Sequence, residues 1–163
     1  MMGMILLIVG AGLCLSYFPV YAVFQIFFPV RMDHPAPIQV VRSILLITLL
    51  VTATFLASFL PTDPHLGNRL LHGLGGGLTV FFVCFRVVKD GNFKVNRLQF
   101  FILSLLLVTA LGVGNEIIEL GLQRYLDITM AKNVSDTWFD LVSNTTGAIL
   151  AGTIITPFVK EGK

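Results

Sequence analysis

Five long apolar runs constrain the fold of this chain more than any other feature. The hydrocarbon core of a bilayer is about 30 Å thick, and a helix needs about 20 apolar residues to cross it. The runs lie at residues 4–28, 38–60, 66–88, 98–122 and 136–159. Only 12% of the 163 residues are charged, about half the fraction found in soluble domains. The pattern therefore predicts an all-α, polytopic membrane bundle of about five transmembrane helices.

The segments between the runs have the composition of loops. PVRMDHPAP, PTDPH and KDGNFKVNR follow the first three runs and are rich in proline, glycine and charged residues. No repeat or change of composition divides the chain, so we expect a single domain over residues 1–163. Pro19 falls within the first run and predicts a kink, which a bundle tolerates because neighbouring helices satisfy the freed backbone groups.

The basic residues predict an orientation. With five spans the termini lie on opposite faces. One face then carries Arg31, Arg42, Arg86, Lys89, Lys94, Arg97, Lys160 and Lys163, and the other carries Arg69, Arg124 and Lys132. The positive-inside rule places the N-terminus outside and the C-terminus in the cytoplasm. We expect a multi-pass protein of the plasma (inner) membrane, and the small net charge of +2 argues against a nucleic-acid partner.

Polar residues gather at the predicted outer ends of three spans. They are Asp63, His65, Arg69 and His72 on the third, Asn115, Glu116 and Glu119 on the fourth, and Asp136, Asp140 and Asn144 on the fifth. At about 100° per residue, one stripe holds His65, Arg69, His72, Gly76 and Thr79, and another holds Asp136, Asp140, Ser143, Asn144 and Gly147. In lipid these stripes are expected to face one another. The cytoplasmic half is predicted to have no comparable acidic group.

The cost of burying charge makes these residues candidates for a site. An ionised side chain costs about 2.5–3.5 kcal/mol at the bilayer centre, so such a group is first treated as functional. The candidate pocket residues are His72, Asn115, Glu116, Glu119, Asp136, Asp140 and Asn144. Of these, Glu119 and Asp136 lie near the interface. The deeper ones, His72, Glu116, Asp140 and Asn144, are the strongest candidates.

Each candidate also has a structural alternative. Asp136 is placed to act as a helix N-cap, and Arg69 to form a salt bridge with Asp63 at the rim. An amide such as Asn144 also joins helices in membrane bundles. The glycines of HGLGGG, Gly73 to Gly77, predict close approach of helix backbones.

The region from residue 63 to residue 152 resembles a known family. The order NEIIEL and then, after a short loop, DTWFDLVSNTTGAILAG is similar to the VanZ-like membrane proteins, including relatives of the YjdF type that form a domain of unknown function. The matching positions are Asp63 and His72, Glu116 and Glu119, and Asp136, Asp140, Asn144, Gly147 and Ala148. Two departures are the long separation of Asp63 from His72 and the second glutamate, which is closer to the YjdF type. The resemblance implies a small helical membrane bundle, associated in its best-known member with teicoplanin resistance.

Three functions remain open at this stage. The first is a pocket for a lipid-like or lipid-linked amphiphile, with membrane lipids as partners and the loop at 123–135 as its rim. The second is a non-catalytic accessory subunit that docks on other membrane protein subunits. The third is an enzyme on a lipid-linked substrate, in which His72, Glu116 and Asp140 hold a divalent metal or act as acid and base. The sequence identifies no cofactor.

Overall fold

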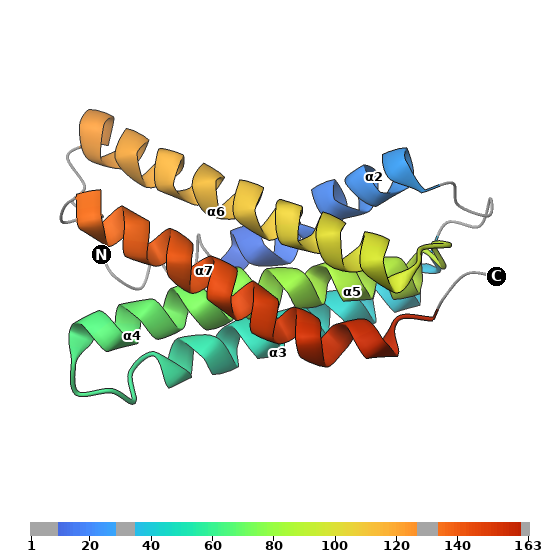
Figure 1. Ribbon diagram of the computed structural model, residues 1–163, viewed down its shortest axis with the longest axis horizontal. Coiled ribbons are helices and arrows are strands. Elements are labelled where there is room, and N and C mark those ends of the chain that lie inside the picture. Colours follow the sequence, from blue (N-terminus) through green and yellow to red (C-terminus); the bar gives the residue numbers. More distant parts are fainter. Residues whose placement is uncertain (1–9, 29–34, 127–133, 161–163) are drawn as a thin grey trace.

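The computed structural model describes residues 10–28, 35–126 and 134–160. All regular structure in these ranges is helical (Figure 1). Five stretches are long and apolar enough to cross a membrane. They are Gly10–Phe27, Pro37–Ala57, Pro64–Asp90, Arg97–Leu126 and Val134–Phe158. The prediction of an all-α fold with five candidate spans is confirmed.

The first span is interrupted close to the predicted position. Its helical residues 10–15 end in a turn at Ser16, and helix α2 then runs over Tyr17–Phe27. Pro19 cannot donate a backbone hydrogen bond, and its ring opposes the carbonyl of Leu15. At the turn, the Ser16 hydroxyl donates to the Leu13 carbonyl at 2.6 Å. Residues 4–9 of the predicted span lie outside the described part of the chain.

The third span is one continuous helix of three parts. The second span, helix α3 (Pro37–Ala57), precedes it. The three parts of the third span are α4 (Pro64–Leu70), the π-helix η1 (Leu71–Thr79) and α5 (Val80–Asp90). Asp63 caps α4, since its Oδ1 accepts from the backbone N–H of His65 at 2.9 Å, and Pro64 takes the first helical position. The π-helical turn is wider than an α-helical one, yet His72 and Gly76 of the predicted stripe both face α7, at Asp140 and Asn144 respectively.

The fourth span extends beyond its predicted end, and the fifth span begins before its predicted start. Helix α6 (Arg97–Leu126) begins at a reciprocal cap in which Asn96 and Gln99 each accept from the other's backbone N–H. Helix α7 (Val134–Ile155) is followed by the short 3-10 helix η2 (Thr156–Phe158). The predicted rim at 123–135 is therefore partly wrong, because residues 123–126 are helical. Residues 127–133 lie outside the described part.

The third span is the centre of the bundle (Figure 1). In its most apolar window 56% of the residues are buried, against 17–22% in the other four spans. The most extensive contact is between η1 and α7, and α6 packs against α7. Large apolar side chains such as Leu45, Leu49 and Ile117 are exposed on the outside. This arrangement suits a bundle that presents its outer faces to lipid.

Glycines bring η1 and α7 into close contact. A Cβ atom at Gly77 would overlap the Asn144 carbonyl oxygen on α7, and one at Gly147 would overlap the Gly73 carbonyl oxygen on η1. Gly75 differs, because its Cβ would meet nothing closer than 4.0 Å. Close packing through the HGLGGG segment is confirmed for the glycines that face α7.

Candidate functional site

Three of the predicted pocket residues meet at one end of the bundle. His72 comes from η1, Glu116 from α6 and Asp140 from α7. Each residue offers one atom of a type that binds metal ions, and these three atoms lie within 4.8 Å of one another. His72 is partly buried, whereas Glu116 and Asp140 are buried. We call these three residues the carboxylate–histidine cluster.

Arg69 on α4 connects the cluster to the start of α7. Its Nη2 lies 2.5 Å from Asp136 Oδ1, and its Nη1 pairs with Asp140 Oδ1. The guanidinium also lies over the ring of Phe139, 5.0 Å from its centroid. The predicted rim salt bridge between Arg69 and Asp63 is wrong. The Asp63 carboxylate is used locally as a helix cap, while the longer arginine side chain reaches the neighbouring helix.

Asp136 is not a helix N-cap, the structural role that was the alternative to a place in the pocket. Helix α7 begins at Val134, so Asp136 lies in its first turn, and its carboxylate pairs with Arg69. A carboxylate there still benefits from the positive end of the helix dipole. Asp136 therefore helps to hold the arginine that contacts Asp140.

Asp140 accepts several donors through one oxygen. Besides Arg69, Asn68 donates from Nδ2 to Oδ1 at 3.0 Å, and His72 Nε2 lies 3.4 Å from the same oxygen. The predicted stripe did not include Asn68, because it favoured His65. The structure leaves His65 exposed. The signal that could have found Asn68 is its position one turn before His72.

Glu116 is the least satisfied group in the site. Its exposed fraction is 8%, and within the described residues neither carboxyl oxygen has a hydrogen-bond partner. Thr137 and Asn115 are polar neighbours of its carboxyl group. A buried carboxyl group without a partner is costly for stability. The burial of the Glu116 carboxyl group therefore points to a ligand at this position.

Glu119, one turn beyond Glu116 on α6, is held by its own helix. Asn115 donates from Nδ2 to Glu119 Oε1 at 2.7 Å. Glu119 is partly buried and adds a further acidic group beside Glu116. With Asp136 and Asp140, the site thus has four carboxyl groups against one guanidinium. It carries an acidic formal charge.

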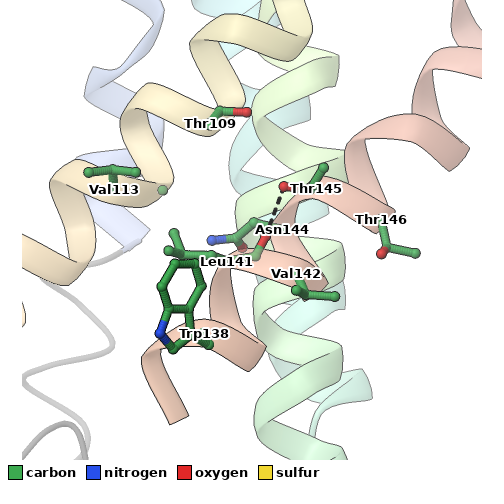
Figure 2. A pocket seen from close by; sticks show the side chains of 9 residues that line it. Thr109, Val113, Trp138, Leu141, Val142, Asn144, Thr145 and Thr146 are labelled. Carbon is green, nitrogen blue, oxygen red and sulfur yellow. Dashed lines mark hydrogen bonds between the residues drawn. The ribbon is translucent and has the colours of Figure 1, made fainter. Parts of the chain in front are cut away.

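Asn144 connects this site to an apolar groove. The buried amide lies between Gly76 and Gly112, where a Cβ atom would come within 3.0 Å of Nδ2 from the Gly112 side. Its Oδ1 has no hydrogen-bond partner in the described ranges. The groove lies between α6 and α7, has a volume of about 360 Å³, and is lined by Thr109, Gly112, Val113, Trp138, Leu141, Val142, Asn144, Thr145 and Thr146 (Figure 2).

A second polar cluster, which the sequence did not predict, lies at the opposite end of the third span. Asp90 accepts from Tyr17 at 3.0 Å, from Ser43, and from Arg86 Nη2 at 2.9 Å. The half of the bundle predicted to be cytoplasmic was expected to have no comparable acidic group. This prediction is wrong, because Asp90 is buried at the end of α5 and not in a loop. The Arg86–Asp90 spacing of four residues was the available signal. Every member has a partner, so we assign this cluster a structural role.

The comparisons with known proteins identify a family. A family model described as "Predicted membrane protein (DUF2238)" matches residues 2–161. No curated protein and no solved structure matches the chain. The family match carries no link to the VanZ-like proteins, so that part of the resemblance stays a prediction.

Proposed function

The chain belongs to the DUF2238 family of predicted membrane proteins, and we propose that its polar site binds the head group of a lipid-like or lipid-linked amphiphile. The observation that carries this proposal is the position of Asn144. Its amide lines the apolar groove between α6 and α7, and it neighbours His72 of the carboxylate–histidine cluster. One amphiphile could therefore place its chain in the groove and its head group at the cluster.

The groove has the chemistry of a chain-binding surface. Its walls are mainly apolar, and Trp138 and Val142 are exposed on α7. Ligand sites in proteins are typically apolar clefts with a few polar groups that fix the orientation of the ligand. Here Thr109 and Asn144 supply such groups within the groove. A membrane lipid would reach this groove from the side.

The cluster favours particular head groups. Its carboxyl groups accept hydrogen bonds, and Glu116 has both oxygens without a partner among the described residues. A head group with hydroxyl or ammonium N–H donors would satisfy these acceptors. A quaternary ammonium has no N–H and would not. With the N-terminus outside, as the basic residues predict, the site lies in the outer half of the bilayer.

Lipid retention tests this proposal. Delipidated full-length protein in mild detergent is given phosphatidylethanolamine or phosphatidylcholine, and bound lipid is measured by native mass spectrometry. We expect phosphatidylethanolamine to be held more strongly, since only its head group donates N–H bonds. Thr109→Phe should reduce its retention by about tenfold, because the larger side chain fills part of the groove.

Leu111→Phe is the matched control, since Leu111 is exposed on α6 and does not line the groove. It should leave retention unchanged. Equal retention of the two lipids, or normal retention in Thr109→Phe, would contradict the proposal.

A further inference from the structure

We propose that the carboxylate–histidine cluster is a divalent metal site, in which His72, Glu116 and Asp140 are the protein ligands. This inference rests on the proposed function, because the ion would occupy the head-group end of the same pocket. It assigns a further chemical role to Glu116, since one of its two partnerless oxygens belongs to the cluster.

The donor set and its geometry fit a first-row divalent ion such as Zn²⁺ or Mn²⁺. Imidazole nitrogen suits zinc, and carboxylate oxygen suits both ions. In a tetrahedral site, ligand bonds of about 2.0–2.2 Å place the ligand atoms about 3.4 Å apart. The three candidate atoms lie within 4.8 Å of one another, so the most distant pair needs to approach by at most about 1.4 Å to close the site. Three protein ligands leave a coordination position open for a head-group oxygen.

Glu116 is the second observation that points to an ion. It is more than nine-tenths buried, and its two oxygens have no hydrogen-bond partner in the described part of the chain, yet one of them belongs to the cluster. A buried carboxylate is stabilised by a partner of opposite charge or by a metal. Arg69 does not supply this partner, because its guanidinium pairs with Asp136 and Asp140.

The surrounding charges also favour a cation. Glu116, Glu119, Asp136 and Asp140 give a formal charge of −4, which Arg69 reduces to −3 when His72 is neutral. A divalent ion would reduce it further to −1. Such a change is substantial where little water screens the charges.

The contacts of Asp140 resemble the support that metal ligands receive. Arg69 and Asn68 both bond to Oδ1, which orients the carboxylate and leaves Oδ2 for an ion. Asn144 neighbours His72 and can orient the imidazole ring. Hydrogen-bonded neighbours of this kind fix the geometry of metal ligands.

The test measures metal binding by the full-length protein in mild detergent. The protein is stripped with a chelator, and Zn²⁺ and Mn²⁺ are then added separately. Bound metal is measured by mass spectrometry and affinity by calorimetry. We expect one ion per chain and a rise in Tm of about 5 °C. Glu116→Gln should weaken binding at least tenfold, because the amide cannot replace the anionic ligand.

Asp63→Asn is the matched control. It also removes one carboxylate at the same end of the bundle, and asparagine still caps a helix. This variant should bind the ion normally. In the absence of metal, Glu116→Gln should be at least as stable as the parent, since it removes a buried charge, and this Tm verifies its folding. His72→Gln provides a second ligand variant with the same expected loss of binding.

The outcomes separate this inference from the proposed function. A stripped protein that takes up neither ion but still retains phosphatidylethanolamine would overturn the metal site and leave the amphiphile proposal standing. Normal binding in both Glu116→Gln and His72→Gln would place the ion elsewhere and also overturn it. Ion binding without lipid retention would support the metal site and contradict the amphiphile proposal.

Discussion

At the scale of single residues, Asn144 and the glycines around it show how the polar site is accommodated. Gly76 and Gly112 leave room for the amide between η1 and α6. The asparagine is therefore buried at a helix crossing where a larger neighbour would displace it. Packing and the polar site depend on the same small residues.

Gly77→Ala is expected to destabilise the protein. The added methyl group would overlap the backbone of α7 at Asn144 and Ala148, which cannot move without separating the helices. We expect a loss of about 1–3 kcal/mol, as for other overpacked cores. The measurement is thermal unfolding in detergent.

Gly75→Ala is the control for this prediction. It lies in the same π-helix, but its methyl group would meet only Leu71 at 4.0 Å. It should be neutral or slightly stabilising, because alanine favours helices more than glycine. If the two variants unfold at the same temperature, close packing of η1 on α7 does not limit stability.

At the scale of elements, the buried Asp90 cluster joins three helices. Tyr17 comes from α2, Ser43 from α3, and Arg86 and Asp90 from α5. These bonds hold the first two spans against the central helix at the end opposite the carboxylate–histidine cluster. The hydrogen-bonded Asp90 cluster and the proposed ligand site thus lie at opposite ends of the third span.

Asp90→Ala should be strongly destabilising. It leaves the Arg86 guanidinium buried without its anionic partner, and breaking a buried pair in this way typically costs about 3–5 kcal/mol. Tyr17→Phe removes one hydrogen bond to the same carboxylate and should cost about 1 kcal/mol. Chemical denaturation followed by circular dichroism would measure both. A smaller loss in Asp90→Ala than in Tyr17→Phe would contradict the structural role of the cluster.

At the scale of the whole molecule, the structure changes which basic residues count toward the predicted orientation in the membrane. Arg86 and Arg69 are paired with carboxylates inside the bundle, so neither acts as a free positive charge at the surface. Without them the predicted bias becomes seven basic residues against two. The proposed orientation, with the N-terminus outside, is retained.

Accessibility of introduced cysteines tests this orientation. Thr62→Cys replaces an exposed residue between α3 and α4, and Lys94→Cys replaces an exposed residue between α5 and α6. In intact cells a membrane-impermeant maleimide should label the first, and the second should be labelled only after permeabilisation. The reverse pattern would place the polar site on the cytoplasmic side.

The sequence by itself determined the helices of this protein, because a run of about 20 apolar residues can satisfy its backbone in lipid only as a helix. It also indicated His72, Glu116, Asp140 and Asn144 as candidates, since polar groups in apolar spans are costly. Pattern and composition are local properties of the chain, so neither inference required knowing which helices pack against one another.

Tertiary structure alone decided which of these groups meet. Asn68, one turn before His72, joins Arg69 and His72 at Asp140, while His65 remains exposed. Arg69 pairs with α7 and not with Asp63, and Asp90 is buried among three helices. These outcomes depend on the distances between packed helices, which spacing along one chain segment does not specify.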